Sequence, residues 1–145
     1  MTDLSIVIVS YNSAKTISHC LESIKSSSID QESLNIVIVD NNSKDHTVAL
    51  INDYYPDVTV IINDDNVGFA KACNIGAKSS QSSYLLFLNP DTVLDYKALE
   101  FLLSYANTQD GKVVLGGALY DGRNNYLQES ARSLPTLSSS LLRIS

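Results

Sequence analysis

The chain is short of positive charge, and this shortage excludes several kinds of partner. Its 145 residues include 10 Lys and Arg against 16 Asp and Glu, a formal net charge of −6 at pH 7. An acidic surface argues against broad nucleic-acid binding and against attachment to an anionic membrane. An anionic ligand would therefore need a local device, such as a metal ion, helix N-termini or a few placed cations.

Long apolar segments and a basic N-terminal region are also missing. Unbroken apolar runs reach only about five residues, whereas a helix needs about 20 to span a bilayer. The first residues, Met1 to Asp3, lack the basic region with which a signal peptide begins. We therefore expect a cytoplasmic protein with no membrane anchor in this segment.

Cysteine and histidine are too scarce for a disulfide framework or a zinc site. Cys20 and Cys73 each fall within apolar residues at helical spacing, so we expect both to be buried free thiols. His19 and His46 have no partner at ligand spacing. The glycine-rich dinucleotide fingerprint, the P-loop and the serine-hydrolase elbow are absent too, which excludes three common α/β functions.

What the sequence does contain is a regular alternation of apolar strands and amphipathic helices. Five predicted strands begin at intervals of 24 to 30 residues, which is typical of repeated βα units. This rhythm predicts an α/β fold, with a mostly parallel sheet and helices on both faces. The predicted strands cover 4–9, 34–39, 58–62, 84–88 and 112–119, the last interrupted by Gly116-Gly117. The predicted helices cover 13–25, 45–55, 68–78 and roughly 99–106, and Ser13 is the predicted N-cap of the first.

The regular pattern ends near residue 120. We therefore predict an α/β domain over 1–120 and the incomplete start of a further region over 121–145. That region contains a predicted turn at 121–125, a short predicted strand at 126–131 and an apolar tail at 137–144. Because little chain follows to bury this tail, we expect either a truncated protein with a missing C-terminal region or a partner, such as a second copy of the chain.

The stretch from Leu85 to Thr92 is the first candidate site. An apolar run stops abruptly at Asn89, Pro90 and Asp91, the pattern of a buried strand with polar groups at its carboxyl end. Pro90 fixes its own φ and favours an extended Asn89, so Asp91 should point in a defined direction. The alternative is a structural turn in which Asp91 caps the following helix.

Three further strands end in the same polar way, and ligands of parallel α/β sheets bind at this edge. Tyr11 could stack on a nucleobase, Asp40 could accept a hydrogen bond from a base N–H, and Asp91 could hold a divalent cation against a diphosphate. The alternatives are a half-buried packing role for Tyr11 and a helix cap for Asp40. The four strand ends are Ser10-Tyr11-Asn12, Asp40-Asn41-Asn42, Asn63-Asp64-Asp65-Asn66 and Asn89-Pro90-Asp91.

Four motifs in this order resemble the family 2 glycosyltransferases of GT-A fold, and especially their rhamnosyltransferase-like branch. The resemblance covers roughly residues 4 to 135, and it rests on the ordered set rather than on any single motif. The motifs are Ser5–Asn12, Ile38–Ser43, Asn66–Gly76 and Leu86–Asp91.

The resemblance implies that the α/β domain over 1–120 binds a nucleotide-diphospho-sugar donor and that 121–145 is the incomplete start of an acceptor-side region. Tyr11 and Asp40 would contact the base. Asn89 and Asp91 match the position of the family's D-x-D motif, where Mg²⁺ or Mn²⁺ bridges the diphosphate. Because an amide replaces the first carboxylate, Asp91 would carry the metal-binding role largely alone. The implied donor-binding residues are Ser10, Tyr11, Asn12, Asp40, Asn41, Asn42, Asn66, Gly68, Phe69, Ala70, Asn74, Asn89 and Asp91.

The resemblance also implies an inverting transfer to a glycan or lipid-linked acceptor during polysaccharide or cell-wall assembly, at the inner face of the membrane. The candidate donor is dTDP-rhamnose. The family's catalytic base lies well beyond the D-x-D position, whereas Glu129 is the only acidic residue after Asp121 and is poorly placed for that role. We therefore expect the base to be absent from this chain, which alone would be inactive. The alternative function is a non-catalytic nucleotide-sugar-binding module, or a fragment that needs a partner.

Overall fold

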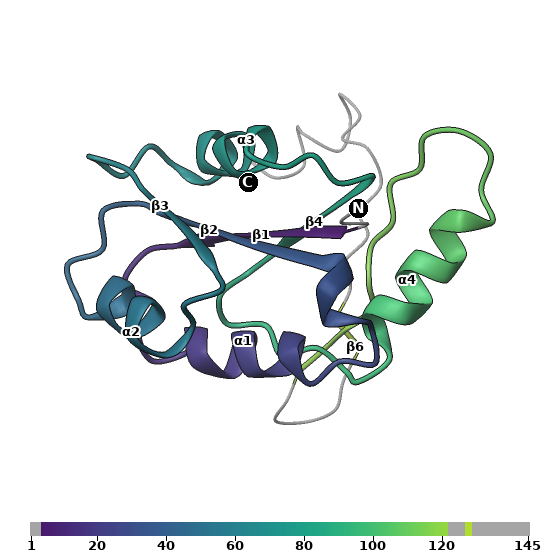
Figure 1. Cartoon of the computed structure of the whole chain (residues 1–145), viewed down its shortest axis with the longest axis horizontal. Coiled ribbons are helices and arrows are strands. Elements are labelled where there is room, and N and C mark those ends of the chain that lie inside the picture. Colours follow the sequence, from purple (N-terminus) through teal and green to yellow (C-terminus); the bar gives the residue numbers. More distant parts are fainter. Residues whose placement is uncertain (1–3, 122–126, 129–145) are drawn as a thin grey trace, which may run out of the picture. The chain divides into compact units, whose positions relative to one another are not determined.

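The computed structural model describes residues 4–121 and 127–128, which form a parallel sheet with helices against both of its faces (Figure 1). The chain divides after Phe101 into two compact units, and all four parallel strands belong to the first. Their order is β3-β2-β1-β4, which confirms the predicted mostly parallel α/β fold. The strands are β1 (Leu4–Ser10), β2 (Leu34–Asp40), β3 (Thr59–Ile62) and β4 (Tyr84–Leu88).

Strand β1 forms the centre of the core, because it pairs with β2 on one side and β4 on the other. All seven of its residues are buried, as its β-branched side chains on both faces predict. Figure 1 shows α3 on one face of the sheet and α1 and α2 on the other. The helices are α1 (Ile17–Lys25), α2 (Thr47–Tyr54), α3 (Phe69–Lys78) and α4 (Ala98–Asn107), with a short 3₁₀ helix η1 (Gln31–Ser33) before β2.

The prediction that Ser13 caps the first helix was wrong. Helix α1 begins at Ile17, and a turn over Ser13 to Thr16 precedes it, with Thr16 N donating to Ser13 O at 3.0 Å. The Ser13 hydroxyl instead accepts a hydrogen bond from Tyr11 N at 3.3 Å, within its own loop. A local contact of the loop therefore replaces the helix cap that the sequence favours.

The predicted fifth strand over 112–119 was also wrong for most of its length. Residues 112–118 form no strand, and only β5 (Leu119–Tyr120) pairs, antiparallel, with β6 (Leu127–Gln128). Strand formation depends on a neighbouring strand and on packing, and a β-branched run without either does not pair. The predicted tail at 137–144 lies outside the described residues, as do most of the predicted turn at 121–125 and most of the predicted strand at 126–131.

The two thiols differ in burial. Cys20 on α1 is fully buried, as expected, whereas Cys73 on α3 is only half-buried, which corrects the expectation for that residue. In the described part of the chain, no helix combines the length and the apolar character that crossing a bilayer requires.

Helix α3 lies close to the sheet at Gly76. A Cβ atom added there would overlap Val7 Cγ1 and would lie 3.1 Å from Val39 Cγ2. Both valines are buried, and their β-branched side chains have little rotamer freedom to move aside. Gly76 therefore sets the distance between α3 and the two central strands.

Replacing Gly76 with alanine should lower the free energy of unfolding by about 2 kcal/mol. Overpacking at so tight a contact costs about 3 kcal/mol, and the better helix propensity of alanine returns about 1. Urea unfolding followed by far-UV circular dichroism measures the change. The matched control is Gly116→Ala, where nothing lies within 4 Å of the added Cβ. If Gly76→Ala were as stable as the wild type, the close approach of α3 would be contradicted.

Candidate functional site at the carboxyl edge of the sheet

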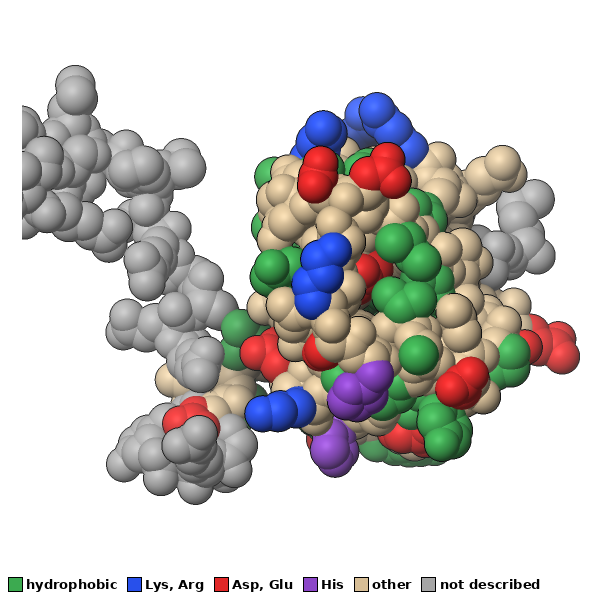
Figure 2. Space-filling view, turned by 90° about the vertical axis from the view of Figure 1, so that its left-hand side faces the viewer, with side chains coloured by type: hydrophobic (Ala, Val, Ile, Leu, Met, Phe, Trp, Pro, Cys, Tyr) green, Lys and Arg blue, Asp and Glu red, His purple; other side chains and the backbone are tan. Residues whose placement is uncertain are grey.

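The carboxyl ends of the four parallel strands meet at one edge of the sheet. The chain runs outward from β1 to β2 and β3, and then returns to place β4 on the other side of β1. This reversal makes the gap between the ends of β1 and β4 a topological switch point, where open α/β sheets bind ligands. Figure 2 shows the molecule from this side, with acidic, lysine and histidine side chains among hydrophobic and other uncharged surface.

Asp40, at the end of β2, is fully buried and ties the ends of β1 and β2 together. Its Oδ1 accepts hydrogen bonds from Ser10 Oγ at 2.7 Å and from Ser43 Oγ at 2.6 Å, and its Oδ2 accepts one from Ser43 N at 2.8 Å. A carboxylate offers roughly four acceptor positions, so these three bonds leave about one unused. Asp40 is therefore a structural centre of this edge, whatever else it contacts.

Asn12 fastens the β1–α1 loop to the β2–α2 loop. Its φ of 53° lies in the left-handed region, which asparagine tolerates better than most residues. Asn12 Oδ1 accepts from Lys44 N at 2.7 Å and Asp45 N at 3.3 Å, and Asn12 N donates to Ser43 Oγ at 2.8 Å. The side chain of Asn12 therefore stabilises the contact between the two loops. Tyr11, beside it, is 51% exposed, and its ring is open to a ligand.

Asp45 anchors the start of α2. Its carboxylate accepts from Thr47 N at 3.0 Å, from Thr47 Oγ1, and from Ala14 N at 3.1 Å. Partial burial acts to raise the pKa of Asp45, but these hydrogen bonds and the charge of His46 outweigh it and lower the pKa. Because the folded protein favours the charged carboxylate, this contribution to stability is present at neutral pH and is lost as the pH falls through the lowered pKa.

The end of β2 is joined to the end of β3 by two asparagines. Asn41 is 3% exposed, and its Oδ1 accepts from Asn63 Nδ2 at 2.9 Å. Asn42 has a φ of 64°, and its side-chain amide donates to Asp64 O. Three of the four predicted strand ends are therefore linked to one another by side-chain hydrogen bonds.

The predicted residues from Asn66 to Asn74 surround the start of α3. Gly68 precedes the helix with φ 82° and ψ 162°, a conformation that is open essentially to glycine alone. Its N–H donates to Asn66 Oδ1 at 3.0 Å. Phe69 is 57% exposed, and Ala70 and Asn74 also have exposed side chains. This group presents backbone and side chains to solvent without an internal network like that of Asp40.

Asn89 and Asp91 lie in a turn that follows β4. Thr92 N donates to Asn89 O at 3.1 Å, with Pro90 at the second position, where it favours such turns. The alternative role of Asp91 as a cap does not hold, since α4 begins only at Ala98. The side chains of Asn89 and Asp91 are both exposed. The turn therefore presents an amide oxygen and a carboxylate at the edge of the sheet.

A divalent cation fits this donor set only if a ligand completes it. Within residues 4–121 and 127–128, no three His, Cys, Asp or Glu side chains are gathered as a metal site would require. Mg²⁺, however, is commonly held by one or two carboxylates together with the phosphates of a substrate. Asp91, with the Asn89 amide oxygen, suits an ion that takes its other ligands from a diphosphate and water.

Cys20 lies beneath this turn. Its Sγ donates to Asn89 O at 3.6 Å, a long contact acceptable for sulfur. Burial raises the pKa of the Cys20 thiol to about 12, and the charge of Asp91 acts in the same direction. The thiol is therefore protonated at neutral pH and is poorly reactive.

Ser43, Asp45 and Thr47 also organise this edge, although they are not among the predicted site residues. Ser43 follows Asp40 by three residues, and Thr47 follows Asp45 by two, which are spacings of local side-chain-to-backbone hydrogen bonds. That signal was available, but it is shared by many ordinary turns. The contacts with Asn12 and Ala14, more than 30 residues away, were not predictable from it.

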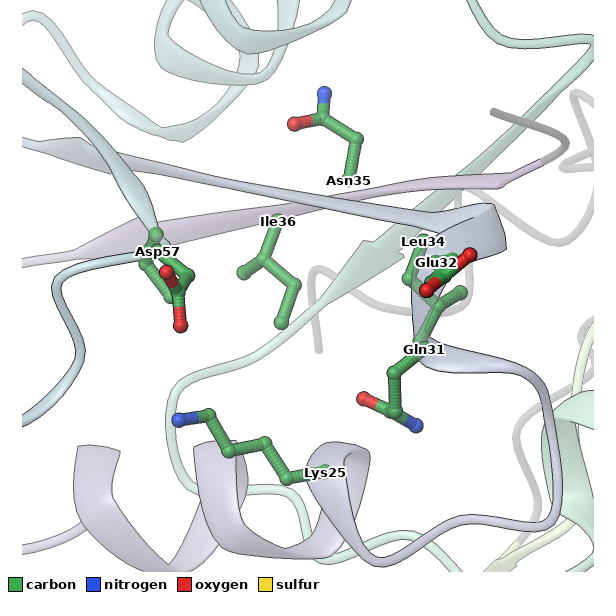
Figure 3. A pocket seen from close by; sticks show the side chains of 8 residues that line it. Lys25, Gln31, Glu32, Leu34, Asn35, Ile36 and Asp57 are labelled. Atoms are coloured by element: carbon green, nitrogen blue, oxygen red, sulfur yellow. The ribbon is translucent and has the colours of Figure 1, made fainter. Parts of the chain in front are cut away.

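A cavity of about 500 Å³ lies at the opposite edge of the sheet, near the amino ends of β2 and β3 (Figure 3). Lys25 and Ile36 lie on its α1 side, whereas Asn35 points to the other face of the sheet. None of the predicted site residues lines it. Its lining residues are Lys25, Gln31, Glu32, Leu34, Asn35, Ile36, Asp57 and Val58.

Comparison with known proteins relates nearly the whole chain to one family. A family model described as glycosyl transferase family 2 matches residues 5–143. The chain is 34% identical over 117 residues to a teichoic acid poly(glycerol phosphate) polymerase of Staphylococcus epidermidis, covering 78% of this chain and 16% of that protein. It is 32% identical over 117 residues to a poly(ribitol-phosphate) beta-glucosyltransferase of Bacillus spizizenii, covering 78% and 18%.

The fold of the chain is also similar to that of a solved structure. The crystal structure of S. aureus TarS 1-349 in complex with UDP superposes with a TM-score of 0.67 at 23% identity, over 72% of this chain and 32% of that one. At this identity the likeness confirms the fold alone. The chain spans less than a fifth of the length of the two relatives named above.

Proposed function

The chain belongs to glycosyl transferase family 2, and from this premise we propose that the carboxyl edge of its sheet binds a nucleotide-diphospho-sugar. The bound sugar would be transferred to an acceptor by the whole enzyme, of which this chain supplies the donor site. The observation that carries the proposal is the meeting of the four polar strand ends at one edge of the sheet, which includes the topological switch point between β1 and β4. Ordinary loops need no such concentration of amides and carboxylates on one edge.

The base of the donor would lie against Tyr11. The exposed ring of Tyr11 offers a flat apolar surface beside the end of β1. Asp40 is fully buried, so a base N–H would reach the acceptor position that Ser10 and Ser43 leave unused when the residues that cover Asp40 move aside on binding. Uracil and thymine each carry one N–H between two carbonyl oxygens, which suits a single remaining acceptor. We therefore propose a uridine or thymidine diphosphate donor, which includes dTDP-rhamnose.

The diphosphate would lie at the turn after β4. Asp91 and Asn89 would hold a Mg²⁺ or Mn²⁺ ion, whose charge would offset the negative charge that builds up on the leaving nucleoside diphosphate. Gly68 would permit close approach of the backbone on the other side of the site, because it has no side chain and adopts a conformation closed to other residues. The protein's net charge of −6 makes this local cation more necessary.

The proposals for the acceptor side and the stereochemistry are supported by the family and its relatives. We propose an inverting transfer to a glycan or lipid-linked acceptor, with the relatives' glycerol- and ribitol-phosphate polymers as the model of acceptor chemistry. The enzyme would work beside the inner face of the membrane, where lipid-linked acceptors are presented. The catalytic base is not among the donor residues described above.

The test is calorimetric titration of the chain with UDP, dTDP and GDP in the presence of Mn²⁺. We expect saturable binding of UDP or dTDP, and binding of GDP about 10-fold weaker, because guanine presents two donors, its N1–H and its 2-amino group, to the single remaining acceptor of Asp40, so one of them would lose its partner. Failure of all three nucleotides to bind would overturn the proposal. The full-length protein should also consume the donor when an acceptor is present. Binding without any consumption would favour a non-catalytic nucleotide-sugar-binding module.

A further inference from the structure

The turn that carries Asp91 is held by hydrogen bonds to α1, and not by α4, the helix that follows it in the sequence. Residues 89–97 separate β4 from α4 without regular structure, so another part of the protein must hold this segment. Ser23 on α1 is buried, and its Oγ accepts a hydrogen bond from Leu94 N at 3.0 Å. The same hydroxyl donates to Cys20 O at 2.7 Å, so its orientation is fixed by its own helix.

A second contact lies one helical turn earlier, at the other end of the segment. Cys20 is three residues before Ser23, which places the two side chains on one face of α1. Cys20 Sγ donates to Asn89 O, the same oxygen that accepts from Thr92 N to close the turn. The two residues of α1 thus hold the segment at Asn89 and at Leu94, with Asp91 between them.

A third contact extends this attachment beyond the end of α1. Ser28 N donates to Tyr96 O at 2.8 Å, and Ser28 Oγ donates to Glu100 Oε2 at 2.8 Å. The path from Asn89 to Glu100 therefore follows α1 and the residues directly after it. Since α1 also continues from the end of β1, one helix connects the two sides of the switch point between β1 and β4.

We infer that Ser23, supported by Cys20, is a positioning residue for Asp91: its hydrogen bond to Leu94 N holds the turn in the place from which Asp91 reaches a divalent cation. This inference rests on the proposed donor site. Ser23 touches neither donor nor cation. It acts by reducing the freedom of an exposed carboxylate, and a ligand placed in advance binds more tightly than one that must be ordered on binding.

The test compares Ser23→Ala with Ser27→Ala. Both serines are 8% exposed, and both hydroxyls donate to a carbonyl of α1, Ser23 to Cys20 O and Ser27 to Ile24 O at 2.6 Å. Only Ser23 also binds the segment of Asp91. The loss of stability caused by removing a buried hydroxyl should therefore be similar in the two variants. Only Ser23→Ala should also change the position of the turn.

The quantity to measure is the factor by which Mn²⁺ strengthens UDP binding, from titrations with Mn²⁺ and with EDTA. Ser23→Ala should reduce this factor about 5-fold and leave the metal-free affinity unchanged, since the loss is that of one hydrogen bond. Ser27→Ala should leave both unchanged. In an Asp91→Asn background, Ser23→Ala should have no further effect, because the two residues act through the same contact.

Three results would contradict the positioning role of Ser23. Equal metal factors in Ser23→Ala and Ser27→Ala would overturn the positioning role while leaving the donor site in place. A Ser23→Ala effect that persists in the Asp91→Asn background would also overturn it, because the serine would then act through another route. If the wild-type chain bound no nucleotide at all, the proposed function itself would fail, and the inference with it. Amide exchange at Leu94 provides a metal-free readout and should speed up in Ser23→Ala alone.

Discussion

Replacing Asp40 with alanine should lower the free energy of unfolding by about 3 kcal/mol, the largest effect that we expect from a single substitution at this edge. The variant removes the acceptor of Ser10 Oγ, Ser43 Oγ and Ser43 N at a fully buried position. Hydrogen bonds to a charged group are each worth about 1.5–3 kcal/mol, and water can replace part of this loss at the half-buried Ser43. Urea unfolding followed by circular dichroism gives the value.

Asp40→Asn keeps the shape of the side chain and removes its charge. The amide oxygen can still accept from Ser10 Oγ and Ser43 Oγ, but its NH₂ group would face Ser43 N–H, so two donors would meet. We expect a loss of about half that of Asp40→Ala, or ~1.5 kcal/mol. Ser43→Ala, which keeps the carboxylate, is the control for the hydroxyl bonds. A stability of Asp40→Ala within 0.5 kcal/mol of wild type, the range of an ordinary surface change, would contradict the structural role.

Replacing Asp91 with asparagine should have the opposite profile, with a large effect on ligand binding and little on stability. Mn²⁺-supported UDP binding should weaken about 30-fold, the equivalent of a charge-assisted contact of ~2 kcal/mol. The free energy of unfolding should change by less than ~0.5 kcal/mol, because the Asp91 side chain is exposed. Titration calorimetry with Mn²⁺ and with EDTA measures the first, and urea unfolding measures the second.

Asp95→Asn is the matched control for Asp91→Asn. Asp95 is an exposed carboxylate of the same segment, and its Oδ1 accepts from Lys97 N at 3.1 Å near the start of α4. The variant removes the same charge four residues further along, so a general electrostatic effect would appear in both. Equal losses of nucleotide affinity in the two variants would contradict a specific metal-holding role for Asp91.

The contrast between Asp40 and Asp91 shows why strand-end carboxylates are hard to interpret from sequence. Both follow apolar strands, and the sequence predicts a ligand contact for each. In the structure Asp40 is fully buried with three hydrogen bonds, whereas Asp91 stands exposed on a turn. The two carboxylates differ because their neighbours in space differ. Ser10, which binds Asp40, lies on a strand 30 residues away in the sequence, and no local sequence pattern predicts that contact.

Local sequence patterns predict the four parallel strands, the helices between them and the edge at which the polar residues collect. These features follow from local patterns: β-branched runs on both faces of a strand, apolar residues at helical spacing, and Asn, Asp and Pro where a strand stops. Even β1, the most buried element, was predictable, because only a central parallel strand can bury every residue of such a run.

The remaining features depend on contacts between segments that are far apart in the chain, so only the tertiary structure shows them. The run at 112–119 forms almost no strand because it finds no neighbour to pair with along most of its length. Ser13 caps no helix because its loop takes up its hydrogen bonds. The turn of Asp91 is held by α1 through contacts that cross about 70 residues of sequence. Local patterns fix which segments become strands and helices, but the placement of an exposed carboxylate is set by the surfaces that pack beneath it.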